Sequence, residues 1–200
     1  MNIKWEFMAI ILLSALLLGS CGNGGIGSAA VGSLDYQYCA SQMSLWGDVC
    51  GTAFRAELTL GEWDGTGSRP LTLVYSEPEA LRGVSIVCEG GVWAVKYEDL
   101  TLTGSPAERL SLPAQVFSLT GEVTFIGTEP LPEGGNASVL SVRLASEDNG
   151  GKDAGQSPAT ARVCAAHDGG KSRPISVSLD LPDGRSAAVN VTSYVRLPAE

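Results

Sequence analysis

The stretch LTLVYSEPEALRGVSIVCEGGVWAVKYEDLTL, residues 71–102, carries the clearest structural signal in the chain. Its apolar residues recur at every second position, in the rows Leu71, Leu73 and Tyr75, then Val84, Ile86 and Cys88, then Trp93, Val95 and Tyr97. This period is typical of strands that bury one face. Glu89-Gly90-Gly91 has the composition of a hairpin turn. The stretch therefore predicts antiparallel strands that share one apolar face.

The same alternation continues on both sides of this stretch. It predicts further strands at 54–60, 123–125, 140–144, 175–181 and 187–191, which makes about eight in all. Three segments break the alternation and favour short helices instead: 35–47, 78–82 and 106–120. The polar residues 146–158 read as a loop within one β-rich domain that covers residues 35–200.

A sheet with one apolar face needs a cover for that face. A second sheet would give a β-sandwich, whereas a sheet that curls around its own apolar surface would be closed by short helices. The helix-like inserts after the second and fourth predicted strands favour the second arrangement. We therefore expect a mainly β fold, a curved antiparallel half-barrel covered by short helices, with the β-sandwich as the alternative.

The first twenty residues have the three parts of a secretory signal peptide. A positive start at Lys4 precedes the apolar run from Phe7 to Leu18, which at twelve residues is too short to span a membrane stably. Leu18-Gly19-Ser20-Cys21 then resembles the bacterial lipobox, in which the cysteine receives a diacylglycerol and becomes the new amino terminus. Several acyl chains exceed what stable anchoring needs. We expect Cys21 to anchor the protein at the extracytoplasmic face of a bacterial cell membrane, with an ordinary secretory signal as the alternative.

Residues 21–34 form the lipidated cysteine and a Gly-rich flexible tether. Gly22 to Gly27 also match the G-x-G-x-x-G pattern of dinucleotide sites. That pattern requires a preceding strand and a helix that opens at its last glycines, and here the signal precedes it. The sequence therefore predicts that these glycines form a flexible spacer and bind no cofactor.

The net charge of −9 argues against nucleic-acid binding, which needs clustered Lys and Arg. Four cysteines remain after Cys21, and an even number outside the cell admits disulfides with three connectivities. The pairings considered are Cys39–Cys50 and Cys88–Cys164, with free thiols as the alternative. Without a C-x₂-C pair, and with its one histidine elsewhere, the sequence predicts no metal site.

Candidate catalytic groups are sparse. His167 lies beside Asp168-Gly169-Gly170 and is interpreted as an exposed turn residue, because its sequence neighbour Asp168 faces the other way along a strand. Glu98 and Asp99 are adjacent, so they do not face each other across a cleft as glycosidase carboxylates do. We expect no enzyme activity. Trp46, Trp63 and Trp93 can stack on sugars, but packing in the core or against a hairpin is commoner.

The pattern of residues 52–125 resembles a family of uncharacterised lipoproteins from Gram-positive gut bacteria. The residues that carry it are Tyr75, Pro78, Leu81, Gly83, Trp93 and Tyr97. This pattern is in turn similar to the LolA-like lipoprotein-carrier half-barrels. The resemblance implies that an acyl chain binds between a curved sheet and covering helices.

The predicted pocket for an apolar ligand is lined by Phe54, Leu58, Leu73, Tyr75, Ile86, Trp93, Val95 and Phe117. The predicted partners are the membrane, through the anchor, and a lipid or other apolar ligand. The alternative function is a structural or protein-interaction module of the cell envelope that binds no ligand and whose protein partner the sequence does not name.

Overall fold

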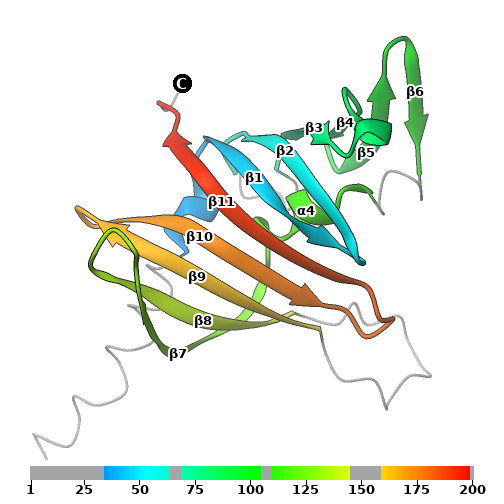
Figure 1. Cartoon of the computed structure of the whole chain (residues 1–200). Helices are drawn as coiled ribbons and strands as arrows, with labels where there is room; N and C mark the ends of the chain where they lie inside the picture. The colour runs from blue at the N-terminus through cyan, green and yellow to red at the C-terminus, as the bar shows by residue number, and fades with distance from the viewer. Residues whose placement is uncertain (1–33, 64–68, 105–109, 145–158, 199–200) are drawn as a thin grey trace, which may run out of the picture.

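Eleven strands form one antiparallel sheet in the computed structural model, which describes residues 34–63, 69–104, 110–144 and 159–198 (Figure 1). The strands are β1 (Ser41–Val49), β2 (Thr52–Leu60), β3 (Leu71–Glu77), β4 (Ser85–Glu89), β5 (Val92–Tyr97), β6 (Leu100–Thr103), β7 (Gly121–Pro130), β8 (Asn136–Leu144), β9 (Thr160–Asp168), β10 (Lys171–Asp180) and β11 (Ser186–Arg196). The short helices are the 3₁₀ turns η2 (Asp35–Tyr38) and η3 (Glu79–Leu81) and the α-helix α4 (Leu112–Gln115).

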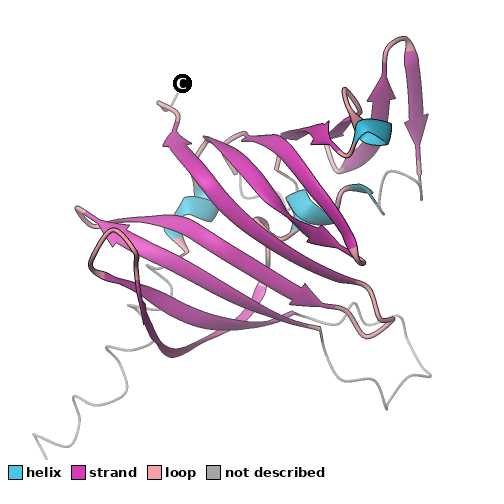
Figure 2. Ribbon diagram, in the orientation of Figure 1, coloured by secondary structure: helices cyan, strands magenta, loops and turns pink. Residues whose placement is uncertain are grey.

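The order of the strands explains how the sheet is covered. Across the sheet it runs β6-β5-β4-β3-β2-β1-β11-β10-β9-β8-β7, so the first and last strands meet in the middle and β6 and β7 are unpaired edges. The chain must therefore cross the sheet from one edge to the other between β6 and β7, and α4 lies on this crossing. Figure 2 shows α4 and η2 on the same side of the curved sheet. The expected curved half-barrel is confirmed, and the β-sandwich alternative is wrong.

The face of the sheet that packs against η2 and α4, here called the covered face, holds the main core. Leu58, Leu73 and Ile86 of the sheet are fully buried there, as are Tyr36 of η2 and Phe117 after α4. Successive side chains of a strand point to opposite faces of the sheet, so the residues that alternate with these core residues point to the opposite, outer face. A second, smaller cluster lies apart from the main core and is made of Ala137, Val139 and Cys164 with Leu131 and Ile175 packed against it.

The predicted helix over 35–47 is wrong for most of its length. Only Asp35–Tyr38 forms a helical turn, and Ser41–Val49 is the central strand β1, with Met43 and Leu45 buried and Ser44 and Trp46 turned outward. Pairing with β2 and with the distant β11 on its two sides overrides the local pattern. Strands β6 and β9 were also missed. The helical turn predicted within 78–82 is confirmed as η3.

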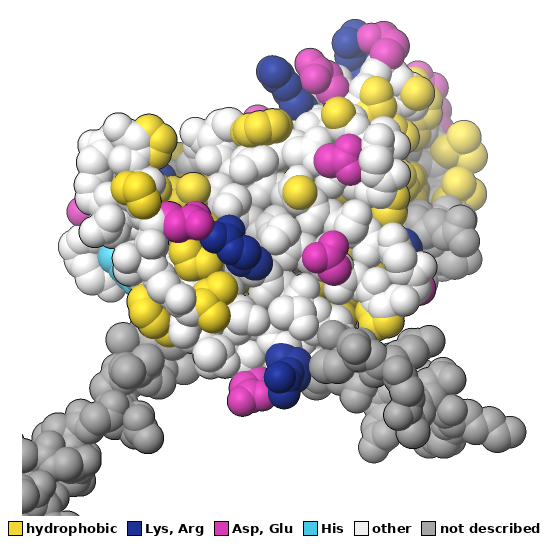
Figure 3. All heavy atoms as spheres, turned by 60° about the horizontal axis from the view of Figure 1, so that its bottom comes forward, with side chains coloured by type: hydrophobic (Ala, Val, Ile, Leu, Met, Phe, Trp, Pro, Cys, Tyr) yellow, Lys and Arg dark blue, Asp and Glu magenta, His cyan; other side chains and the backbone are white. Residues whose placement is uncertain are grey.

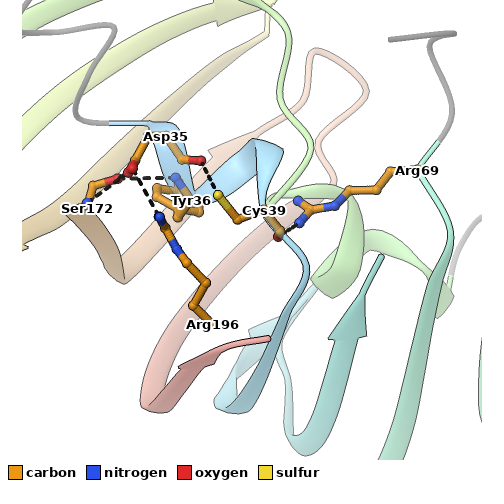
Figure 4. Close-up of polar contacts among 6 residues, drawn as sticks. All are labelled: Asp35, Tyr36, Cys39, Arg69, Ser172 and Arg196. Carbon is orange, nitrogen blue, oxygen red and sulfur yellow. Dashed lines mark hydrogen bonds and ion pairs between the residues drawn. The ribbon is translucent and has the colours of Figure 1, made fainter. Parts of the chain in front are cut away.

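Hydrogen bonds hold the start of the described chain against the end of the domain (Figure 4). Asp35 accepts hydrogen bonds from the backbone N–H of Ser172, at 2.8 Å, and from its hydroxyl, and it pairs with Arg196 at 3.0 Å. On the other side, Arg69 donates to the carbonyls of Gln37 and Gly61, each at 2.6 Å, and to that of Cys39. Burial lowers the pKa of Arg69 to about 10.

Leu34, the last residue of the predicted tether, is already buried in the core. The predicted signal peptide, Cys21 and the rest of the tether lie outside the described residues, as do the predicted polar loop 146–158 and residues 106–109 of the predicted third helix. No helix in the described ranges is long and apolar enough to cross a membrane.

Neither of the two disulfides considered is formed, and the alternative holds: Cys39, Cys50, Cys88 and Cys164 are free thiols. Cys39 and Cys50 flank opposite ends of the nine-residue strand β1, which is itself about 30 Å long at roughly 3.3 Å per residue. Cys88 belongs to the main core and Cys164 to the smaller cluster, with five strands between β4 and β9. Neither pair meets the Cα separation of about 4.4–6.8 Å that a disulfide needs. Burial raises the pKa of both Cys88 and Cys164.

Candidate functional site

A row of directly paired apolar residues crosses the covered face from the core to the β6 edge. The strand register joins Leu58 to Leu73, Leu73 to Ile86, Ile86 to Val95 and Val95 to Leu102. The first three of these side chains are fully buried, Val95 is half-buried, and Leu102 is 53% exposed. The apolar face of the sheet therefore continues beyond the segments that cover it.

The closed part of the covered face is held by a contact between the sheet and the segment that leads into α4. The Tyr75 hydroxyl donates a hydrogen bond to the carbonyl of Leu110 at 2.7 Å. Its ring packs edge-on against Phe54, with 6.0 Å between the ring centroids. Burial raises the pKa of Tyr75, which keeps the phenol protonated as a donor. Pro113 in the first turn of α4 and the bond from the Gln115 amide to Ser111, at 2.6 Å, define this short helix.

The open part is a ledge formed by the last two strands before the edge. Tyr97 pairs with Leu100, and Val95 pairs with Leu102, so these four side chains share the covered face. Tyr97 is 44% exposed and Leu100 is 63% exposed. Figure 3 shows hydrophobic side chains gathered at the end of the molecule where β5 and β6 lie, on the right. We call Trp93, Val95, Tyr97, Leu100 and Leu102 the apolar ledge.

All eight predicted pocket residues lie on the covered face and belong to its core cluster or pack against it. Phe54, Leu58, Leu73, Tyr75, Ile86 and Phe117 are buried in it. Trp93 and Val95 are half-buried and belong to the apolar ledge. A side chain without accessible area has no room for even a water beside it, so the fully buried residues form packed core rather than the wall of an open space.

Sequence reasoning missed the exposed members of the ledge. The alternation places Tyr97 in an apolar row, but it was not followed as far as Leu100 and Leu102, which were left out of every row. The signal was present in Leu100-Thr-Leu-Thr103, which alternates directly after the turn at Glu98-Asp99. Only the register with β5 shows that these leucines extend the covered face.

The other candidate residues are scattered. His167 is exposed near the turn between β9 and β10, as predicted, and pairs in register with Ser172. Glu98 and Asp99 form the turn between β5 and β6. Trp63 stacks on Tyr38, with ring centroids 5.1 Å apart. Within the described ranges, no three His, Cys, Asp or Glu side chains gather closely enough to hold a metal ion.

Solved structures show the same fold. An uncharacterised conserved protein from Thermus thermophilus is 14% identical with a TM-score of 0.54, and the match covers 86% of this chain and 88% of that one. MucB is 15% identical with a TM-score of 0.52, and the match covers 89% of this chain but 62% of MucB. At such identities these likenesses establish the fold alone.

A third match is the lipoprotein LppX from Mycobacterium tuberculosis, which is 18% identical with a TM-score of 0.48, over 90% of this chain and 99% of LppX. No protein-family model matches the chain, and no curated protein matches it. The likeness to the solved structures is one of architecture: an open, curved antiparallel sheet with short helices against its apolar face.

Proposed function

We propose that this protein is a membrane-anchored bacterial lipoprotein whose domain binds an apolar ligand, such as an acyl chain, on the apolar ledge. The observation that carries the proposal is the cross-strand row that starts fully buried at Leu58 and ends half exposed at Leu102. The ligand would lie on Tyr97, Leu100 and Leu102 and extend the core outward.

The energetics favour a ligand on this ledge. Burying apolar surface contributes roughly 25 cal/mol per Å², so covering one leucine side chain is worth about 1.5–3 kcal/mol. Adjacent exposed apolar residues on one face are also typical of binding sites rather than of ordinary surface. The resemblance to lipoprotein-carrier half-barrels supports an acyl chain as the ligand.

The anchor is the second part of the proposal. Residues 18–21 resemble the lipobox, and lipidation of Cys21 would hold the domain at the extracytoplasmic face of the membrane. The tether up to the buried Leu34 would then set the distance between the bilayer and the sheet.

The alternative function is docking of a protein strand at the β6 edge. Strand β6 carries neither charge nor proline, whereas the opposite edge strand β7 contains Glu122, Glu129 and Pro130 and an irregular register near Ile126. Charges, prolines and bulges protect edge strands from pairing. The β6 edge is therefore the better of the two for strand addition.

The test measures binding of a fluorescent acyl probe, dansyl-undecanoic acid, to protein purified without denaturation. Leu102→Ser and Leu100→Ser are expected to weaken binding about tenfold each, because each removes an apolar contact. Thr101→Ser and Thr103→Ser are matched controls, since these residues lie on the same strand and point to the opposite face. They should bind like the wild type.

Native mass spectrometry of the same protein should show co-purified lipid. Wild-type affinity in both leucine variants, together with a native mass equal to that of the bare polypeptide, would contradict the apolar-ligand proposal. If the protein instead captured an extended peptide and Thr101→Pro abolished the capture, strand docking would be the function.

A further inference from the structure

Trp46 occupies an unusual place for a tryptophan, at the middle of the outer face of the sheet. It lies on the central strand β1 and is 50% exposed. Two hollows of about 510 and 450 Å³ flank it, and both are lined by Trp46 and by Arg55, its direct partner on β2. Each volume falls within the range of small-molecule sites, roughly 300–1,000 Å³. The expectation that this tryptophan packs in the core or against a hairpin is wrong.

A third hollow extends the two into a groove along β1. It has a volume of about 220 Å³ and shares Ser44 and Glu57 with the first. The lining runs from Gln42 to Asp48, a length of about 20 Å at roughly 3.3 Å per residue. We call these three joined hollows the Trp46 groove. Its length suits a linear chain rather than a single small molecule.

The strand pairing shapes the groove. Ser44 pairs with Ser193 of β11, but Leu45 pairs with Val191, so Thr192 is an extra residue in the ladder. Its hydroxyl donates to the carbonyl of Ser44 at 3.2 Å. Bulges of this kind increase the local twist of a sheet. Because β1 is paired on both sides, the floor of the groove is fixed before any ligand arrives.

The polar groups of the groove are arranged around the indole. Arg55 pairs with Glu77 at 3.3 Å, and the Ser44 hydroxyl donates to Glu57 at 3.1 Å. Asn190 of β11 pairs in register with Trp46 on the other side. The groove thus offers a flat aromatic face next to guanidinium, amide, hydroxyl and carboxylate groups.

This chemistry excludes two kinds of ligand. An anion would meet Asp48, Glu57 and Glu77 against the single cation Arg55, which is already paired. An acyl chain would desolvate these polar groups without replacing their hydrogen bonds, which is costly. A neutral chain that both donates and accepts hydrogen bonds, and that has an apolar face for the indole, avoids both penalties.

We propose that the Trp46 groove binds a neutral oligosaccharide. The C–H face of one sugar ring would stack on the indole of Trp46, and hydroxyl groups would hydrogen-bond to Arg55, Glu57 and Asn190. The hollows on either side of the indole would hold the neighbouring rings. The groove lies on the face of the sheet opposite the apolar ledge, so this site is independent of the proposed lipid-binding function.

The experiment titrates the full-length protein with chitohexaose, cellohexaose and maltohexaose by isothermal titration calorimetry. At least one of the three is expected to bind and to shift the NMR signal of the Trp46 indole N–H. Trp46→Ala should weaken that binding about tenfold or more, as truncation of an aromatic hot-spot residue does. Trp46→Phe, which keeps an aromatic face, should retain part of it.

Two further variants separate binding from folding. Asn190→Ala leaves the indole in place and should weaken binding by a smaller factor, about threefold to tenfold, as loss of one hydrogen bond does. Ile126→Ala removes another exposed apolar side chain from β7, outside the groove, and should bind like the wild type. Unchanged thermal unfolding of each variant shows that the fold is intact.

Three results would overturn the proposal. They are the absence of binding by all three sugars, wild-type affinity in Trp46→Ala, and selective binding of a deca-lysine peptide, which the acidic lining would attract without any need for the indole.

Discussion

Asp35 is the residue that ties the start of the folded chain to its end. Burial opposes its ionisation, but hydrogen bonds from Ser172 and Arg196 outweigh burial and lower the pKa of the Asp35 carboxyl below its usual 3.8. A carboxyl whose pKa is lower in the folded state stabilises the protein at pH values above its unfolded pKa. This contribution is lost as the pH falls through the folded value.

We expect Asp35→Asn to lower the free energy of unfolding at pH 7 by about 1 kcal/mol, since a charged hydrogen-bond acceptor is lost at a partly exposed site. The variant should also lose less stability than the wild type between pH 5 and pH 2, where only the wild-type carboxyl takes up its proton. Urea unfolding at several pH values measures both effects. Asp180→Asn, an exposed change on β10, is the control. An identical acid response in Asp35→Asn and the wild type would refute this role.

At the scale of elements, α4 is too short to be stable alone, because isolated helices need roughly 12–15 residues. It depends on packing and on the bond from Tyr75 to Leu110. Tyr75→Phe leaves that part-buried carbonyl without its donor, so we expect a loss of about 1–2 kcal/mol and faster amide hydrogen exchange over residues 112–117. Tyr97→Phe changes an exposed tyrosine, so it should alter neither the free energy of unfolding nor the amide exchange of residues 112–117. Unchanged exchange in Tyr75→Phe would show that packing alone holds α4.

Elements also show where sequence reasoning succeeded and failed. The strands of 71–97 follow from alternation alone, because each pairs with its neighbour along the chain. The central strand β1 does not, because one of its two partners is β11, some 150 residues away. The pocket residues were assigned to the correct face. Which of them are packed and which are open depends on where α4 crosses the sheet, and alternation carries no information about that.

At the scale of the whole molecule, the sheet separates two surfaces of different chemistry. The covered face holds the main apolar core and is exposed at the ledge, whereas the outer face carries the Trp46 groove with its polar lining. In the proposed function, lipidation of Cys21 attaches this sheet to the membrane, and Cys21 lies outside the described residues.

Metabolic labelling with an alkyne palmitate analogue is therefore expected to mark the wild-type protein in a bacterial host. It should not mark Cys21→Ser, because the thiol that receives the lipid is gone. Cys39→Ser, which removes a thiol within the folded domain, is the matched control and should be labelled normally. Equal labelling of Cys21→Ser and the wild type would contradict the anchor.

The sequence alone determined the class of the fold, because a two-residue period over most of the chain specifies strands with one buried face, and such a sheet must be covered. It also supplied the prediction of a lipid anchor at Cys21. Only the tertiary structure decided which strands meet, that the four cysteines stay apart, and that Trp46 faces outward beside Arg55. These are contacts between residues far apart in the chain or on opposite faces of one sheet, and local periodicity does not encode them.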